Sequence, residues 1–261
     1  MTKMRIAVCL KLVPASTSDI RVAPGGQSLL LAGVEMAVSL YDEYALETAL
    51  CLREALPGST IHALSIGGEE CVKCLQHALA LGVDSVLHIR APGADSRAAA
   101  KLAAAALRLL ELDLVLCGRQ ACDDDLWFFP GALGEALGWP HLSAVSSVAA
   151  DGDKRAVECR RRFEGGEQFI HAPWPVVISC DRGPHEPRIP MLKGRLAAKK
   201  MPVPVKTTSE LGIAAADLTP ALAVLRYAPP AQRTPKKVFT CPPTDAAAEL
   251  VRLLREEEKL I

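Results

Sequence analysis

Three short stretches of the chain place polar residues or glycines directly after an apolar run: residues 9–11, 65–68 and 117–120. In an open parallel sheet, ligands bind beyond the carboxyl ends of the strands, where the strand order reverses. Gly67 and Gly68 let the backbone approach a ligand closely, and a following helix offers its first N–H groups to an anion. The pattern therefore predicts a nucleotide crevice lined by Cys9, Leu10, Lys11, Ser65, Ile66, Gly67, Cys117, Gly118, Arg119 and Gln120.

Side-chain patterns that carry catalysis are absent from the sequence. It contains no GxSxG, no Walker A sequence, no SGGxDS pyrophosphatase loop and no His/Cys nucleophile pair. Cys71 and Cys74 form the one CxxC, but they lie on a helical pattern with no second ligand pair nearby. We interpret both as buried or half-buried helix residues, and the histidine spacing indicates no metal site. A carrier or binding protein fits this sequence better than an enzyme.

The composition limits the classes of protein to which the chain can belong. Its 261 residues, 50% of them hydrophobic, can bury a sizeable core in one domain with an appendage. The 30 basic and 30 acidic residues balance, so nothing attracts the whole molecule to nucleic acid or to anionic lipid. No apolar run approaches the roughly 20 residues of a membrane span, and no signal-peptide pattern opens the chain. The nine scattered cysteines indicate a reducing compartment, so we expect a cytoplasmic protein.

Apolar runs alternate with stretches of helical period along most of the chain. The strands are predicted at residues 6–10, 59–66, 85–89, 112–117 and 176–180, and the helices at 43–55, 71–81, 94–110 and 131–137. Strands without polar alternation are covered on both faces. This predicts an α/β fold with a doubly wound, mostly parallel sheet of the Rossmann-like, adenine-nucleotide-binding type. Residues 143–149 and 163–171 are predicted as antiparallel strands joined around Asp151 and Gly152.

A loop punctuated by proline follows the last parallel strand. Pro184, Pro187 and Pro190 prevent a regular ladder or helix, and basic residues come next. Residues 181–200 are therefore predicted to form a shaped, exposed docking element.

Beyond Lys200 the chain becomes rich in proline, which divides it into a core domain of residues 1–200 and an extension of residues 201–261. The extension ends in a predicted helix over residues 244–258, capped by Thr244 and Asp245, with an apolar stripe along one side. This helix either folds back on its own domain or contacts a partner subunit.

Six segments resemble, in order, the beta subunits of electron-transfer flavoproteins. They are residues 5–21, 41–47, 78–84, 113–125, 164–166 and the loop that contains Glu186, Pro187 and Arg188. The resemblance implies a heterodimer with an FAD-binding alpha subunit, which the extension reaches over. It implies electron transfer from a flavin dehydrogenase to a quinone reductase or similar acceptor. It also implies an apolar docking anchor at Leu192, with Glu186, Pro187, Arg188, Lys199 and Lys200 as further docking residues.

The resemblance further implies that the crevice holds AMP, or a second FAD in electron-bifurcating members, and it adds Ser39, Asp123, Asp124 and Asp125 to the site. The chain departs from the family at residues 126–130, Leu-Trp-Phe-Phe-Pro, where relatives carry Thr, Asn or Gln. Each missing hydrogen bond costs about 1–3 kcal/mol. Ser39 and Leu40 likewise replace the usual Asn-Pro. Backbone N–H groups either suffice to bind the phosphate, or residues 127–129 fill the crevice or face a partner.

Two other functions remain open at this point. A stand-alone, homo-oligomeric adenine-nucleotide-binding protein of the universal-stress type would contain no flavin. An electron-bifurcating beta subunit would hold its own FAD in the crevice. In the simple type, the redox FAD belongs chiefly to the alpha subunit.

Overall fold

The computed structural model describes residues 3–231 and 238–261. Its centre is a nine-stranded sheet with the strand order β11-β10-β9-β12-β8-β1-β6-β7-β13. In this order, the seven strands β9-β12-β8-β1-β6-β7-β13 are all parallel to their neighbours. Strand β10 pairs antiparallel with both β9 and β11. The strands are β1 (Arg5–Cys9), β6 (Thr60–Gly67), β7 (Ser85–Arg90), β8 (Leu114–Gly118), β9 (His141–Asp151), β10 (Ala156–Phe163), β11 (Gly166–Pro173), β12 (Val176–Cys180) and β13 (Val205–Thr207).

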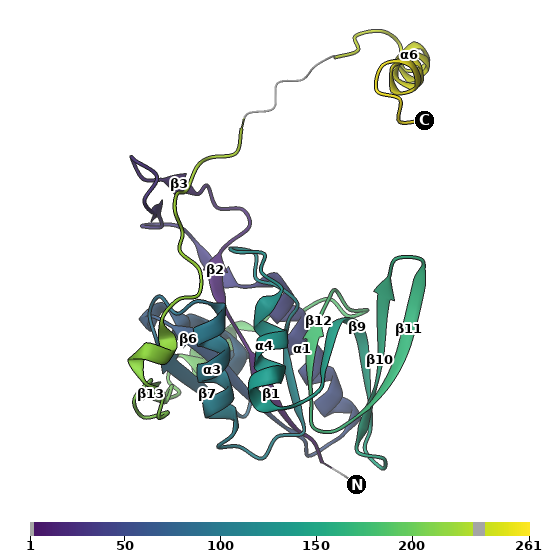
Figure 1. Ribbon diagram of the computed structural model, residues 1–261. Coiled ribbons are helices and arrows are strands. Elements are labelled where there is room, and N and C mark those ends of the chain that lie inside the picture. Colours follow the sequence, from purple (N-terminus) through teal and green to yellow (C-terminus); the bar gives the residue numbers. More distant parts are fainter. Residues whose placement is uncertain (1–2, 232–237) are drawn as a thin grey trace.

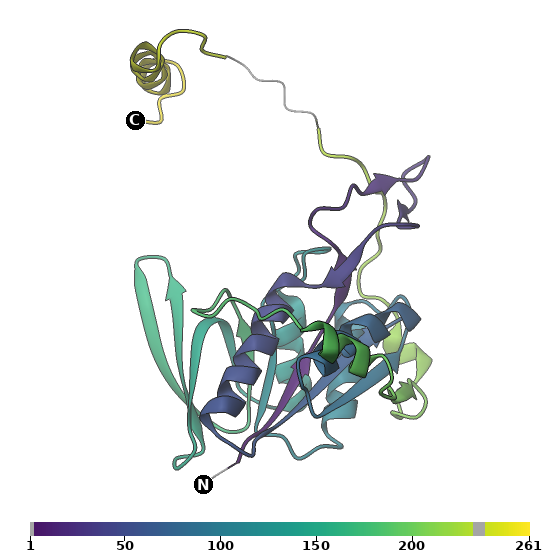
Figure 2. The same ribbon diagram turned by 180° about the vertical axis from the view of Figure 1, so that it is seen from behind.

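Helices cover both faces of this sheet. Helices α1 (Leu40–Ala55), α2 (Val72–Ala80) and α5 (Leu192–Ala198) lie on the face seen in Figure 2. Helices α3 (Ser96–Leu107) and α4 (Phe128–Leu137) lie on the face seen in Figure 1. The predicted α/β fold with a mostly parallel sheet is confirmed.

The two helical layers enclose two separate hydrophobic cores. One packs α1 and α2 against the sheet, and the other packs α3 and α4 against its opposite face. Strands β8 and β12 are buried at all of their positions, which explains why their sequences do not alternate. Small residues along α3, such as Ala100 and Ala103, are fully buried and let this helix lie close to the strands.

Short elements complete the described chain. Strand β2 (Leu12–Pro14) pairs with β5 (Met36–Val38), and β3 (Arg21–Val22) pairs with β4 (Leu29–Leu30) in an arm that projects from the sheet. The 3₁₀ turns η1 and η2 span Glu69–Cys71 and Ala215–Leu218. None of the described helices is long and apolar enough to cross a membrane.

The sequence prediction was wrong at the antiparallel end of the sheet. Phe163 ends β10 and Gly166 begins β11, with Gly165 at φ 91° in the turn between them, so residues 163–171 are not one strand. The turn after Asp151 joins β9 to β10, which the sequence prediction missed. Strand β10 faces solvent at several positions, and its arginines hide the apolar signal that a buried strand gives.

The C-terminal helix α6 spans Pro243–Glu256. The predicted caps at Thr244 and Asp245 were wrong, because Pro242 takes the N-cap position and no side chain caps the helix. None of its residues is buried, and Figure 1 places α6 away from the sheet. By contrast, β13 follows Lys200 yet pairs with β7, so the sheet takes its last strand from the segment predicted as an extension.

Candidate functional site

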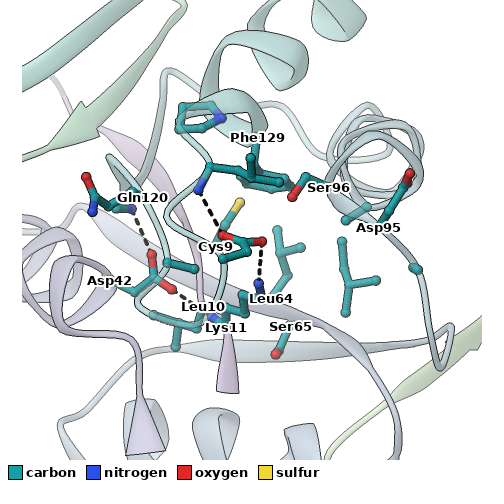
Figure 3. A pocket seen from close by; sticks show the side chains of 18 of the residues that line it. Cys9, Leu10, Lys11, Asp42, Leu64, Ser65, Asp95, Ser96, Gln120 and Phe129 are labelled. Atoms are coloured by element: carbon teal, nitrogen blue, oxygen red, sulfur yellow. Dashed lines mark hydrogen bonds and ion pairs between the residues drawn. The ribbon is translucent and has the colours of Figure 1, made fainter. Parts of the chain in front are cut away.

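A cavity of about 270 Å³ opens at the carboxyl ends of β1, β6 and β8. Strand β1 lies between the other two, so the strand order reverses at β1. The helices that follow the strands lie on opposite faces of the sheet, and a crevice remains between them. Figure 3 shows the side chains that converge on the cavity, with Asp95 and Ser96 at the start of α3 on one side and Asp42 and Gln120 on the other.

The structure brings together part of the set of residues that the sequence predicts. Cys9, Leu10, Lys11, Ser65, Ile66, Gly118, Gln120 and Asp124 line the cavity. Ser39, Gly67, Cys117, Arg119, Asp123 and Asp125 lie outside its lining. The lining also includes residues that were not predicted from the sequence: Asp42, Leu64, Ala94, Asp95, Ser96, Ala99, Ala121, Leu222 and Val224. The segment after β7 carried a usable signal, since Asp95 is a typical helix N-cap in the short loop that follows this partly buried strand.

Asp42 in the first turn of α1 joins two strand ends beneath the cavity. Its carboxylate oxygens accept hydrogen bonds from the backbone N–H groups of Lys11 and Gly118, both at 2.8 Å. A Cβ atom at position 118 would lie 2.5 Å from Oδ1 of Asp42, so this close approach requires glycine. Burial raises the pKa of Asp42 to about 7, and the two N–H donors reduce the shift. This carboxyl group is therefore partly protonated near neutral pH.

The charge of Lys11 is already compensated within the site. Its Nζ lies 2.7 Å from Oδ1 of Asp123 and 2.9 Å from Oδ2 of Asp124. Burial alone would lower the pKa of Lys11, but the two carboxylates outweigh burial and raise it. Lys11 stays charged, with both acidic partners in direct contact.

Arg119 points away from the cavity into an aromatic stack. Its guanidinium carbon lies 4.4 Å from the ring centre of Tyr41 and 4.6 Å from that of Trp127. The same group donates hydrogen bonds of 2.7 Å to Asp181 and to the hydroxyl of Tyr41. This stack holds Trp127 outside the cavity lining, while Phe129 lies in it. The aromatic residues therefore do not fill the crevice.

Ser39 and Asp125 have local structural roles. Ser39 is fully buried at the N-cap of α1, where its N–H donates to the carbonyl of Lys11 at 2.9 Å. Asp125 adopts a φ of 50° and accepts a hydrogen bond of 2.7 Å from Nε2 of Gln120.

The cysteine pair Cys71 and Cys74 is buried, and burial raises the pKa of both thiols. Both thiols are therefore protonated and inert.

A separate group of possible metal ligands, Asp151, Glu158 and His171, lies on β9, β10 and β11 with the ligand atoms within 4.8 Å of one another. The sequence spacing did not indicate it, because cross-strand pairing brings these residues together. Nζ of Lys154 lies 2.8 Å from Asp151 and already supplies a cation there.

The predicted docking loop is held against α1 by two of its charged residues rather than left free. The Tyr44 hydroxyl donates to Glu186 at 2.9 Å, and Arg188 forms ion pairs of 2.7 Å with Glu47 and with Glu54. Leu192 begins α5 directly after this loop and is 72% exposed. Pro187 lies between the two anchored residues, and Lys199 and Lys200 follow α5 at the surface.

Comparison with known proteins shows the family. Residues 29–211 match the family model of the electron transfer flavoprotein domain. The chain is 33% identical over 239 residues to the human electron transfer flavoprotein subunit beta, covering 90% of this chain and 92% of the human one. The chain belongs to the electron-transfer flavoprotein beta subunit family. Its members are electron carriers and not enzymes, and membership implies an alpha-subunit partner.

Bacterial members of the family match to a similar degree. The subunit beta of Bacillus subtilis is 32% identical over 233 residues, covering 88% of this chain and 90% of its own. That of Thermoanaerobacterium thermosaccharolyticum is 32% identical over 259 residues, covering 96% and 98%. The similarity therefore extends through the C-terminal extension.

The family is associated with FAD and AMP, and the cavity fits these ligands unequally. At about 270 Å³ it is smaller than the roughly 300–1,000 Å³ of common ligand pockets, too small for a whole dinucleotide. Its apolar lining suits a base and a sugar. The segment 126–130 offers no side-chain donor except the indole N–H of Trp127, and Pro130 lacks a backbone N–H. These residues do not fit a phosphate group.

Proposed function

We propose that this chain is the beta subunit of an electron-transfer flavoprotein heterodimer. In this role it accepts electrons from a flavin dehydrogenase and relays them to a quinone reductase or a similar acceptor. The redox FAD, held mainly by the alpha subunit, supplies the electron-carrying chemistry when bound. This chain supplies docking surfaces and one wall of the flavin pocket.

The proposal rests on an exposed apolar surface that follows a loop held against α1 by ion pairs. Ile189, Met191 and Leu192 are 80%, 82% and 72% exposed, which is unusual for large apolar side chains in sequence proximity. Basic residues follow immediately, among them Lys193 and Arg195. An apolar centre within a charged rim is typical of a transient protein interface. The ion pairs of the preceding loop with α1 fix the position of this surface on the core.

The C-terminal extension supports a second, more permanent contact. Helix α6 has Leu250 and Val251 on one side, 46% and 44% exposed. Its charged residues are Asp245, Glu249, Arg252, Arg255 and Glu256. We propose that residues 1–200 form the core domain, to which β13 of the extension adds a strand, and that the C-terminal part of residues 201–261 reaches over the alpha subunit, which covers this apolar side. We also propose a cytoplasmic location, which the nine free cysteines support.

Co-expression with the cognate alpha subunit tests the proposal. We expect a yellow heterodimer that contains one FAD, whereas this chain expressed alone should bind no stoichiometric flavin. The heterodimer should be reduced by the flavin dehydrogenase and reoxidised by the acceptor.

The alternatives predict other outcomes in the same experiment. A colourless homodimer that ignores the alpha subunit would support an adenine-nucleotide-binding protein of the universal-stress type. Two flavins per heterodimer, one of them in this chain, would indicate an electron-bifurcating subunit. The small cavity volume argues against that second flavin.

A further inference from the structure

The cavity at the strand ends carries negative rather than positive charge. Its lining includes one cation, Lys11, and three carboxyl groups, Asp42, Asp95 and Asp124. Lys11 is held by Asp123 and Asp124 at 2.7 and 2.9 Å. A phosphate that approaches Lys11 must share it with two carboxylates, which repel the phosphate at short range.

Two backbone donors near the cavity are also engaged by its carboxylates. The N–H of Leu126 donates to Asp124 at 3.1 Å, so this carboxylate occupies a backbone donor as well as Lys11. At the start of α3, the N–H of Ala98 donates to Asp95 at 2.8 Å. Pro130 removes one N–H from the first turn of α4. Each helix start therefore has at least one N–H fewer to offer to an anion.

The remaining lining is suited to an uncharged molecule. Leu64, Ile66, Ala99, Phe129 and Val224 supply apolar surface from four separate parts of the chain. Ser96 places a hydroxyl group on one side of this surface, and Gln120, whose Nε2 donates to Asp125, lies on the other (Figure 3). Apolar walls with a few convergent polar groups are the usual composition of a small-molecule site.

We propose that the cavity binds an uncharged ligand of nucleoside size and discriminates against the phosphorylated form. Its position at the carboxyl ends of parallel strands is where such folds bind nucleotides, and its charge excludes the phosphate. The ligand class follows from the cavity alone, so it does not depend on the electron-carrier role.

Calorimetry on the full-length chain with adenosine and with AMP tests this proposal. Adenosine should bind at least about tenfold more tightly than AMP, equivalent to about 1.4 kcal/mol. AMP that binds as tightly as adenosine or more tightly would overturn the proposal. Failure of both probes to bind would overturn it too. Because no redox partner takes part, these results are independent of the electron-transfer measurements.

Two variants locate the binding and its origin. Ala99→Phe places a ring in the cavity and should abolish adenosine binding, while Ala105→Phe, on the same helix but outside the lining, should leave it intact. Asp124→Asn removes a carboxylate from Lys11. It should raise the affinity for AMP relative to that for adenosine at least about fivefold, and added salt should reduce that gain. An unchanged ratio of the two affinities in Asp124→Asn would show that charge does not set the preference.

Discussion

The ion pair between Arg188 and Glu47 should make a measurable contribution to folding stability, because it joins the docking loop to α1. Arg188 donates to the Glu47 carboxylate through its backbone N–H at 3.0 Å, through Nε at 2.9 and 3.1 Å and through one terminal nitrogen at 2.7 Å. The Glu47 side chain is 7% exposed, whereas that of Arg188 is 38% exposed. Loss of Arg188 therefore leaves a nearly buried carboxylate without its main partner.

The magnitude follows from this uneven burial. Breaking a fully buried pair costs about 3–5 kcal/mol, and an exposed pair contributes about 1 kcal/mol or less. Because water reaches Arg188, we expect a coupling free energy of about 2 kcal/mol. A double-mutant cycle of Arg188→Ala, Glu47→Ala and the double variant, measured by urea unfolding, isolates it. A loss of this size lowers Tm by roughly 4–8 °C in a chain of this length.

A neighbouring pair provides the matched control. Glu54 contacts Arg188 at the same 2.7 Å, but its side chain is 61% exposed. The cycle of Arg188→Ala with Glu54→Ala should therefore give about 1 kcal/mol or less. If the coupling of Arg188 with Glu47 is below about 0.5 kcal/mol, or no larger than that with Glu54, burial does not strengthen this pair.

The contribution of this ion pair to the free energy of unfolding should depend on pH. Burial alone would raise the pKa of Glu47, but the hydrogen bonds from Arg188 outweigh it and lower the pKa below its ordinary value of 4.5. The stabilisation is therefore present above pH 4.5 and is lost as the pH falls through the lowered pKa of the folded state. Arg188→Ala should lack this acid-induced loss.

Three further predictions concern the cavity floor and the docking surface. Because burial raises the pKa of Asp42 to about 7 from 3.8, the folded state keeps a proton that the unfolded chain releases. The free energy of unfolding should therefore fall as the pH rises from 3.8 to about 7, and Asp42→Asn should reduce this slope; an equal slope in both proteins would contradict the prediction. Gly118→Ala should destabilise the fold by about 2 kcal/mol or more, because its Cβ would lie 2.5 Å from Asp42 and 2.8 Å from the backbone of α1. The control is Gly131→Ala in α4, where an added Cβ would meet no atom closer than 3.7 Å. It should be neutral or stabilising when the unfolding of both variants is measured by thermal melts. Leu192→Ala should slow electron transfer from the dehydrogenase at least about tenfold with flavin content unchanged, and the exposed Leu109→Ala should not; a wild-type rate in Leu192→Ala would place docking elsewhere.

Local sequence patterns were enough to predict the parallel half of the sheet and the edge at which a ligand would bind. The continuous apolar runs of β1, β8 and β12 are local features, because a strand covered on both faces must be apolar at every position. The residues that follow such strands are known once the strands are known. For this reason eight of the predicted site residues, among them Lys11 and Gln120, do line the cavity.

Long-range contacts set which other residues complete the site and which way their side chains face. Asp42 comes from a helix and Val224 from the extension, and no local pattern links either to the strand ends. Arg119 follows a predicted strand, yet its side chain turns to Tyr41, Trp127 and Asp181, because these partners offer stacking and an ion pair together. Strand β10 was missed for a similar reason. Its arginines pair across strands, and such pairing depends on register rather than on local sequence.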